Sequence, residues 1–488
     1  MRRQLAILGA SVLALFYSGV AHAQDVLSCG ELIHPAAGPA SAPTVTPGTN
    51  LISVGEAVYF ISGDDTGSGI DPKYLWRTDG TPTGTFTVTT TVADFSPLYL
   101  FTALNDQLIL RATTPDTGAE LWVTDGTPQG TQLLRDITPG ATDTTHHSSW
   151  LALGDRLFFA VYAEGETTWW STAGTAATTA PLPDLAAGDQ PNGYFFAQSA
   201  AEAYLASFVS GKDVMLWRFD GQNFHLVKEF IGDNESSDLT GIGQGLMQNG
   251  KLYFFARVAG GASGLWRSDG TDVGTELLFA GDFVSPTDQS VASGVHPFHL
   301  VATNDHTIFF FEYDQPLLRL WRLDSTLDTT TLVKTIRMRS EDDLYYPLQF
   351  ESALAYDQTL YFSFWWRDNR LQWSQTEIWT SDGTEAGTHF FTGLPMGGAF
   401  YFGTPNGLFL TTSLGVTGTY VLEIPWVQAF PTIVCNLGSH FYAYPKLFLH
   451  NRDIYVSGRN AWLGAEHLWR LDPTTLRPTN VFLPGIAR

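Results

Sequence analysis

Short apolar segments alternate with turn residues along the whole chain, and the pattern repeats. Within one unit the apolar positions predict four strands, at 100–104, 108–112, 120–124 and 131–137. In the third segment, alternation sends Leu121 and Val123 to one sheet face and Trp122 and Thr124 to the other. Because both faces carry large apolar side chains, we expect each small sheet to be covered on both sides.

The tryptophan of the third strand marks each unit. It recurs at 76, 122, 170, 217, 266, 321, 379 and 469, with spacings of 46, 48, 47, 49, 55, 58 and 90 residues. The last spacing holds an eroded unit, since 400–413 aligns with 100–113 and 418–422 aligns with 130–134. That alignment lacks the tryptophan strand. Repeats of this length are typical of propeller blades, which bury their faces by stacking. The sequence therefore predicts an all-β fold, a β-propeller of eight or nine blades with eight full four-stranded repeats and one three-stranded repeat.

These units resemble the bacterial ELWxxDGT repeat family. The fullest copy, 120–137, reads Glu-Leu-Trp-Val-Thr-Asp-Gly-Thr-Pro-Gln-Gly-Thr-Gln-Leu-Leu-Arg-Asp-Ile, and the resemblance extends from about residue 51 to 485. Departures occur in the turn after the tryptophan strand, at 172–174, 219–221, 324–325 and 472–473. The resemblance implies an exported β-propeller and transfers no catalytic residue.

The N-terminus has the features of a secretory signal. Arg2 and Arg3 precede an apolar stretch, and Ala21-His22-Ala23 forms a small-x-small cleavage site. No later segment reaches the roughly 18 apolar residues of a membrane span. We therefore predict a secreted or periplasmic protein without a transmembrane span, divided into a signal peptide at 1–23, an N-terminal arm at 24–50 and a propeller domain at 51–488.

Two cysteines, Cys29 and Cys435, lie far apart in the sequence. In an oxidising compartment they most simply form one disulfide, which ties the arm to the connection that enters the last unit. The first strand is expected near Leu51 and the last near Val481, so neither terminus needs to share a blade with the other. Residues 26–29 loosely match a lipoprotein box, and lipidation of Cys29 is the alternative.

The chain is strongly acidic. Its 49 Asp and Glu residues against 26 Lys and Arg residues give a net charge of −23. A general nucleic-acid binder needs a basic face, so this balance argues against one and favours cations or basic partners. We expect a monomer whose partner is an extracellular or envelope protein or a glycan.

Four aspartates recur before glycine in the strongest copies of the repeat, and they are Asp79, Asp125, Asp269 and Asp382. Carboxylates beside glycine resemble calcium ligands. However, an Asp in a tight turn also accepts hydrogen bonds from backbone N–H groups further along the chain. Because repeats reuse folding devices while binding sites are local, we interpret these four as structural.

The irregular segments fall on the other rim of the expected propeller. Connections between second and third strands, and between blades, share that rim, and they include 62–73, 232–240, 281–297, 339–347 and 366–376. Binding residues concentrate on loops held by a rigid scaffold, and carboxylates suit Ca²⁺ or a cationic partner. The candidate ligand-binding residues are Asp64, Asp65, Asp71, Asp233, Glu235, Asp238, Glu341, Asp342, Asp343, Trp366 and Trp373.

We predict no cofactor apart from Ca²⁺ as a candidate ligand, and no familiar catalytic motif occurs. The sequence favours a binding module over an enzyme. The alternatives are an extracellular polysaccharide- or peptide-acting hydrolase or lyase with carboxylates at the propeller axis, and a structural protein of the cell envelope. A shared zinc site would require histidines from different blades to converge. These histidines are His146, His147, His296, His299 and His440.

Overall fold

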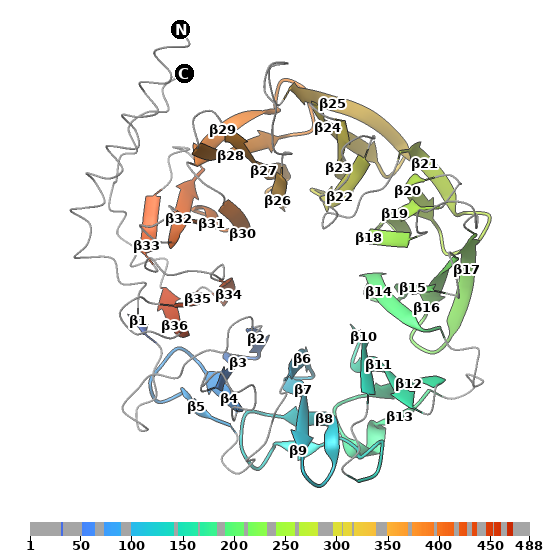
Figure 1. Cartoon of the computed structure of the whole chain (residues 1–488), viewed down its shortest axis with the longest axis vertical. Helices are drawn as coiled ribbons and strands as arrows, with labels where there is room; N and C mark the ends of the chain where they lie inside the picture. The colour runs from blue at the N-terminus through green and yellow to red at the C-terminus, as the bar shows by residue number, and fades with distance from the viewer. Residues whose placement is uncertain are drawn as a thin grey trace.

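The computed structural model is a ring of nine antiparallel four-stranded sheets that follow one another in chain order (Figure 1). It describes residues 31–32, 51–63, 73–88, 99–140, 145–163, 166–182, 191–208, 213–231, 241–258, 263–281, 296–304, 306–314, 317–337, 349–368, 373–394, 398–413, 419–426, 432–436, 446–451, 453–459 and 466–471. Within these ranges the one helical element is the short 3-10 helix η1 (Ala176–Thr178). The predicted β-propeller is confirmed, and it has nine blades.

Each of the first eight blades consists of four consecutive strands, numbered here from the inner strand to the outer strand. Blades one to three are β2 (Ile52–Val54), β3 (Ala57–Gly63), β4 (Lys73–Thr78), β5 (Phe86–Thr87); β6 (Tyr99–Leu104), β7 (Gln107–Thr114), β8 (Gly118–Thr124), β9 (Gln132–Leu133); and β10 (Thr145–Leu153), β11 (Arg156–Ala163), β12 (Glu166–Thr172), β13 (Ala180–Pro181). Blades four and five are β14 (Gly193–Gln198), β15 (Ala203–Phe208), β16 (Val214–Phe219), β17 (Phe224–Phe230); and β18 (Gly241–Gln248), β19 (Lys251–Arg257), β20 (Gly264–Ser268), β21 (Glu276–Ala280). Blades six to eight are β22 (His296–Ala302), β23 (Thr307–Asp314), β24 (Leu317–Asp324), β25 (Thr329–Arg337); β26 (Gln349–Tyr356), β27 (Thr359–Asp368), β28 (Trp373–Ser381), β29 (His389–Leu394); and β30 (Gly398–Gly403), β31 (Gly407–Ser413), β32 (Thr419–Pro425), β33 (Thr432–Asn436).

The ninth blade takes strands from both ends of the chain. Its inner three strands are β34 (Lys446–His450), β35 (Asp453–Arg459) and β36 (Glu466–Leu471), and β1 (Glu31–Leu32) pairs outside β36. The prediction that the termini share no blade was therefore wrong. The reason lies in the backbone register: Leu32 stands opposite Trp469, as Leu133 stands opposite Trp122 in blade two, so β1 takes the place of the fourth strand. The fourth strand expected near Val481 lies outside the described residues.

The seam between blades nine and one is also joined by side chains. The Arg470 guanidinium donates a hydrogen bond to the Gly80 carbonyl at 3.0 Å, and the Asn451 amide donates to Glu56 Oε2 at 2.9 Å. A buried apolar cluster crosses the same seam, and it contains Leu51, Val58, Phe60, Trp76, Tyr455 and Leu468. The ring is thus closed by ordinary blade packing together with the added strand β1.

Blade eight is the eroded unit, and it has four strands, not the expected three. The sequence alignment matched 418–422 with a fourth strand, but residues 419–422 belong to the third strand, β32 (Thr419–Pro425). Its register shifts between Val421 and Leu422, as the third strands of other blades shift between the residue before tryptophan and the tryptophan itself. Leu422 therefore occupies the tryptophan position. Cys435 consequently lies in the fourth strand, β33, and not in a connection, while Cys29 lies outside the described residues.

Apolar side chains from neighbouring blades form shared cores. One cluster joins blades four and five through residues such as Leu216, Phe254 and Trp266, and another joins blades six and seven through Phe311, Leu320 and Phe362. Each fully buried side chain of this size contributes about 1.5–3 kcal/mol. This stacking explains why the repeat is apolar on both faces.

The two rims of the ring differ in their connections. The turn rim carries the first-to-second-strand turns, such as 105–106, and the third-to-fourth-strand turns, such as 125–130. The loop rim carries the opposite strand ends, from which the second-to-third-strand connections and the blade-to-blade connections leave. The described residues cover most of the turn rim and little of the loop rim.

Candidate functional site

The predicted acidic residues of the loop rim lie outside the described residues. They are Asp64, Asp65, Asp71, Asp233, Glu235, Asp238, Glu341, Asp342 and Asp343. The described strands nevertheless end where expected: β3 ends at Gly63 and β4 begins at Lys73, so segment 64–72 leaves from the loop rim. The assignment of these residues to a ligand site stays a prediction.

The two candidate tryptophans lie in strands and not in a loop. β27 and β28 pair further than expected, with Trp366 opposite Gln375 and Asp368 opposite Trp373. Aromatic residues favour the extended conformation of a paired strand, so the hairpin continues through both positions. The loop predicted at 366–376 is therefore reduced to 369–372, and the two side chains lie outside the described part of the structure.

The turn-rim aspartates are engaged in hydrogen bonds within their own turns. Asp125 Oδ1 accepts from the Thr127 backbone N–H at 2.9 Å and from the Thr127 hydroxyl at 2.7 Å. The same two bonds recur at Asp79, Asp269 and Asp382. Around them, Gly130 N–H donates to the Thr127 hydroxyl, and the Thr131 hydroxyl donates to the Thr127 carbonyl. Each of these four carboxylates therefore organises a turn, as a structural role requires.

These hydrogen bonds hold the pKa of the turn carboxyls below the usual range. At Asp125, Asp269 and Asp382 the largest cause is the donated threonine hydroxyl. At Asp79 burial is the largest single effect and raises the pKa, but the bonds from Thr81 outweigh it. Because the folded-state pKa is depressed, the resulting stability is present at neutral pH and is lost as the pH falls through the folded-state value.

Asp125→Ala is expected to lower the free energy of unfolding by about 1 kcal/mol at neutral pH, since two hydrogen bonds to a carboxylate are lost. The difference from wild type should shrink as the pH falls below about 4, where the carboxyl becomes protonated. Urea unfolding followed by tryptophan fluorescence at several pH values measures both effects. Asp116→Ala, in the exposed turn between β7 and β8, is the control and should change little. An equal loss at Asp116 would contradict the assigned role.

At three of the described joints, a tyrosine and an arginine of one blade receive the Asp-Gly turn of the next blade. Gly126 has φ of +89°, and a Cβ added there would collide with the Tyr59 hydroxyl and would approach Arg77 Cδ at 2.9 Å. Tyr204 and Arg218 lie in the same way under Gly270, and Tyr455 and Arg470 under Gly80. Sequence reasoning missed this joint, although arginine follows the repeat tryptophan five times, at 77, 218, 267, 322 and 470.

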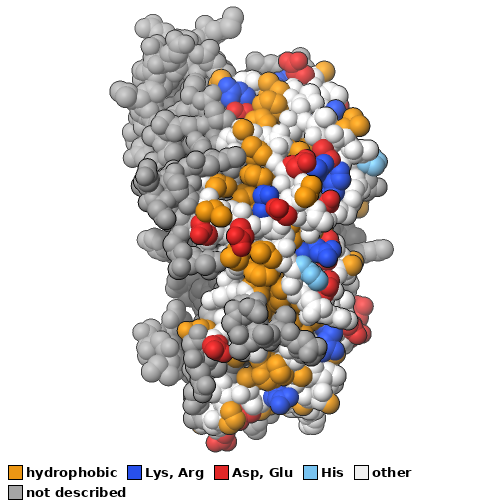
Figure 2. All heavy atoms as spheres, turned by 90° about the vertical axis from the view of Figure 1, so that its right-hand side faces the viewer, with side chains coloured by type: hydrophobic (Ala, Val, Ile, Leu, Met, Phe, Trp, Pro, Cys, Tyr) orange, Lys and Arg blue, Asp and Glu red, His pale blue; other side chains and the backbone are white. Residues whose placement is uncertain are grey.

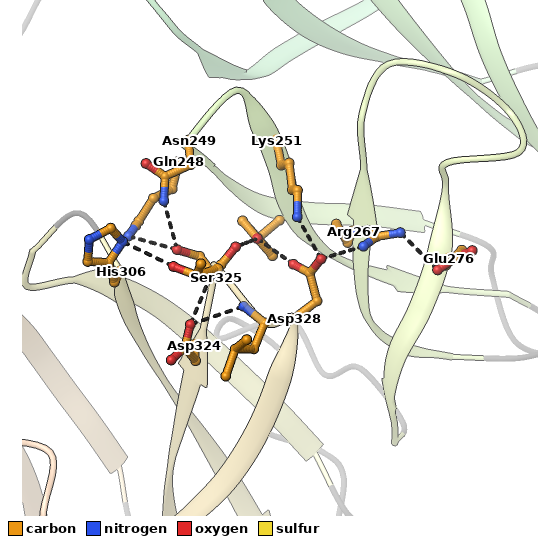
Figure 3. A network of polar contacts seen from close by, with 12 residues as sticks. Gln248, Asn249, Lys251, Arg267, Glu276, His306, Asp324, Ser325 and Asp328 are labelled. Atoms are coloured by element: carbon orange, nitrogen blue, oxygen red, sulfur yellow. Dashed lines mark hydrogen bonds and ion pairs between the residues drawn. The ribbon is translucent and has the colours of Figure 1, made fainter.

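The joint between blades five and six carries a network of polar side chains (Figure 3). Here Ser325 replaces the turn glycine, and Asp328 ends the turn with φ of +52°. Asp328 Oδ2 lies 2.6 Å from Lys251 Nζ and also forms an ion pair with Arg267, while the Tyr253 hydroxyl lies 2.7 Å from Asp328 Oδ1. Gln248 donates to the Asn304 carbonyl at 2.8 Å, and Arg267 also contacts Glu276 at 2.9 Å.

This network is better suited to holding blades five and six together than to catalysis. Burial raises the pKa of Asp328, but bonds from Lys251, Tyr253 and Arg267 outweigh it and lower the pKa below the usual range. Burial also raises the pKa of Tyr253, and its bond to Asp328 adds to that effect. A carboxylate held ionised by two cations is a weak general base, and a phenol with a raised pKa is a poor acid. The groups therefore stabilise the joint.

The glutamate of the repeat is also used by the fold. Glu120 is fully buried, and its Oε1 accepts hydrogen bonds from the backbone N–H groups of Ile137 and Thr138, both at 3.1 Å. It thereby fixes the start of the connection to the next blade. In blade seven, Glu377 Oε2 instead accepts from Trp379 Nε1 at 3.0 Å. These contacts give the first residue of the Glu-Leu-Trp motif a structural explanation.

The inner strands surround the centre of the ring (Figure 1) and are nearly free of carboxylates. The nine strands β2, β6, β10, β14, β18, β22, β26, β30 and β34 contain one acidic residue, Glu351 in β26. They are rich in aromatic residues and bond across blades, as where Gln244 exchanges two hydrogen bonds with the backbone of Leu300, at 3.0 and 3.2 Å. A carboxylate pair at the axis would therefore need residues from the loops.

The candidate histidines come from different blades of the ring. His146 and His147 lie in β10 of blade three, and His296 and His299 lie in β22 of blade six, while His440 is outside the described residues. His299 is largely buried, which lowers its pKa, and its ring lies 4.8 Å from that of Phe350. Within the described ranges, no three His, Cys, Asp or Glu residues are placed to hold a metal ion. No helix in those ranges has the length and apolarity to cross a membrane.

No family model matches this chain, and no curated protein matches it. Among solved structures, it is similar to a prolyl endopeptidase with a TM-score of 0.41 and 11% identity, over 74% of this chain and 54% of that chain. It is also similar to prolyl oligopeptidase B from Galerina marginata, with a TM-score of 0.41 and 11% identity over 74% and 56% of the two chains. It is also similar to the Dos1 propeller, with a TM-score of 0.41 and 13% identity over 74% of this chain and 89% of that chain. The chain spans about half the length of the two peptidases.

Proposed function

We propose that this protein is an exported binding module that takes a cationic ligand at its loop rim. The observation that carries the proposal is the division of carboxylates between the rims. On the turn rim, Asp79, Asp125, Asp269 and Asp382 serve the turns, and Asp328 is paired with two cations. On the loop rim, no such use is apparent from the repeat, because the connections differ in length and sequence from blade to blade.

The undescribed connections that leave the loop rim are strongly acidic. They contain sixteen acidic residues and three basic ones, Lys212, Arg339 and Arg370. The acidic residues are Asp64, Asp65, Asp71, Asp94, Asp143, Glu164, Asp184, Asp189, Asp233, Glu235, Asp238, Asp282, Asp288, Glu341, Asp342 and Asp343. Such an imbalance on one side of a rigid ring raises the local concentration of cations and steers cationic partners toward that rim. We therefore favour a basic polypeptide segment or Ca²⁺ as the ligand.

A second candidate, a glycan, is favoured by exposed aromatic side chains. Tyr74 near the start of β4 and Tyr162 near the end of β11 are 41% and 40% exposed, and both lie at loop-rim strand ends. Exposed aromatic rings with a polar tip are common at recognition surfaces. The two candidate ligands predict a different salt dependence of the binding affinity, since stacking on a neutral sugar is insensitive to ionic strength.

Decalysine and CaCl₂ are the two probes for the test, each titrated into the mature chain with calorimetry and thermal unfolding as readouts. We expect at least one probe to bind, and decalysine binding to weaken about tenfold or more when NaCl is raised from about 0.05 M to about 0.3 M. Asp233→Asn/Glu235→Gln/Asp238→Asn should weaken binding without lowering the melting temperature. Absence of binding by both probes at low salt would contradict the proposal, and binding of a neutral glycan array alone would favour the second candidate.

A further inference from the structure

The outer strands of the blades differ in length around the ring. In blades one to three they have two residues each, whereas β17, β21, β25 and β29 in blades four to seven have 7, 5, 9 and 6 residues. Each outer strand ends its sheet, so its outward backbone groups have no partner strand in that sheet. Native proteins usually keep such edges short or charged, because a long edge invites pairing with another strand. β25 is the longest of these edges.

Exposed aliphatic side chains gather on the same part of the molecule. Leu226, Ile231, Val273, Leu327 and Leu332 are 46%, 67%, 87%, 68% and 43% exposed, and all lie in the outer strands of blades four to six or in the residues that flank those strands. Figure 2 shows a band of hydrophobic side chains along this outer wall, beside a zone of mixed charge. We name these five residues and strand β25 the outer-wall patch.

The other blades provide an internal control for this patch. The residue opposite the tryptophan is apolar in most blades, so Leu226 and Leu332 have a structural reason. Val273 has no such structural reason, because the equivalent turn positions of other blades do without a large aliphatic residue and hold Thr83, Gln129 and Ala386. At the position of Leu327 the other turns hold Pro82, Pro128, Asp272 and Glu385. Val273 and Leu327 are therefore exposed aliphatic residues in adjacent blades that the packing of the repeat does not require.

Charge is nearly balanced at the patch, in contrast with the rest of the chain. Lys228 pairs with Asp272 at 2.7 Å, Arg267 pairs with Glu276 and Asp328, and the nine residues of β25 include no acidic residue. Lysine on an edge normally blocks pairing. However, Lys334 Nζ donates to the carbonyls of Thr388 and Glu385 in blade seven, at 2.7 and 3.2 Å, so its charge is anchored on that blade.

We propose that the outer-wall patch is a dimer interface that receives a second copy of this chain. Two β25 strands related by a two-fold axis pair antiparallel, and the aliphatic tips of each copy cover the wall of the other. A second copy is the occupant that the charges favour. Two chains of net charge −23 repel one another over most of their surface, and the repulsion is least where acidic residues are absent or paired. This proposal replaces the monomer expected from the sequence and does not depend on the ligand of the loop rim.

The test is sedimentation velocity of the mature chain over a range of concentrations. We expect a monomer–dimer equilibrium with a dissociation constant on the order of 10 µM, which tightens as NaCl screens the net charge. Val273→Asp/Leu327→Asp should raise the dissociation constant at least tenfold. Both side chains are exposed, so the melting temperature of the monomer should be unchanged.

Thr83→Asp/Pro128→Asp is the matched control, because it adds the same charge at the position of Val273 in blade one and at the position of Leu327 in blade two. This variant should dimerise like the wild type. A wild-type chain that stays monomeric at about 100 µM in both low and high salt would overturn the proposal. So would an equal loss of dimer in the control, since added charge alone would then explain the effect.

Discussion

Gly126→Ala is expected to cost about 3 kcal/mol of unfolding free energy. About 1 kcal/mol comes from placing a side chain at φ of +89°, and the rest comes from the collision of Cβ with the Tyr59 hydroxyl and Arg77. The joint between blades one and two has to widen to admit one methyl group. Urea unfolding monitored by tryptophan fluorescence measures the loss.

Gly140→Ala separates the two contributions. Gly140 has φ of +95°, but a Cβ there would have no neighbour within 4 Å, so this variant should lose about 1 kcal/mol. Tyr59→Phe combined with Gly126→Ala should recover part of the loss, because the double variant lacks the hydroxyl that the methyl group meets. Equal losses at Gly126 and Gly140, with no recovery in the double variant, would show that the turn does not pack on the neighbouring blade.

Deleting residues 24–32 should lower the free energy of unfolding by about 3 kcal/mol. The deletion removes β1, its backbone hydrogen bonds to β36 at about 1 kcal/mol each, and the residue opposite Trp469. Blade nine then has three strands and an uncovered edge beside the seam. A lower melting temperature and a tendency to aggregate are the expected results of calorimetry and light scattering.

A shorter deletion, of residues 24–28, is the control for that experiment. This deletion removes residues at the start of the mature chain but leaves β1 in place. The melting temperature of the variant should therefore match that of the mature protein. If both deletions melt like the mature protein, β1 does not close the ring, and the remaining seam contacts of Arg470 and Asn451 suffice.

The repeat made the architecture predictable because its aspartate, glycine and glutamate each stabilise the fold. Asp125 accepts hydrogen bonds within the turn, Gly126 packs against the Tyr59 hydroxyl of the neighbouring blade, and Glu120 accepts hydrogen bonds from the next connection. Period and alternation therefore identified the class and located most strands. The four repeated aspartates could be interpreted as structural for the same reason, since every strong copy carries one.

Two features were not predictable from the pattern, because each depends on contacts between distant segments. The pair Glu31 and Leu32 is too short to show strand periodicity, and only its partner strand β36 makes it a strand. In blade eight, the sequence after Gly418 resembles a fourth strand, but packing places Leu422 where other blades have tryptophan. Trp426 replaces the turn glycine there, stacking on Tyr356 at 4.8 Å, and Thr380 replaces the arginine that would block it.

For the candidate site, the sequence predicted which rim carries it but not how its side chains are arranged. Strand order places the variable connections on one rim, but their side-chain positions follow from loop conformation, which no repeat encodes. Trp366 and Trp373 illustrate the limit, since strand pairing continues through both residues and removes them from the predicted loop. By contrast, the Tyr-Arg joint had a signal in the sequence, namely the arginine after tryptophan, and a closer comparison of the repeats would have found it.

The central claim is that the turn rim serves the fold and the loop rim serves the ligand. Two triple variants of equal charge change test it most directly, Asp79→Asn/Asp125→Asn/Asp382→Asn on the turn rim and Asp233→Asn/Glu235→Gln/Asp238→Asn on the loop rim. Calorimetric titration with decalysine at low salt is the measurement. We predict that the turn-rim variant binds like the wild type and the loop-rim variant binds at least tenfold more weakly; the opposite ranking of the two variants would contradict the claim.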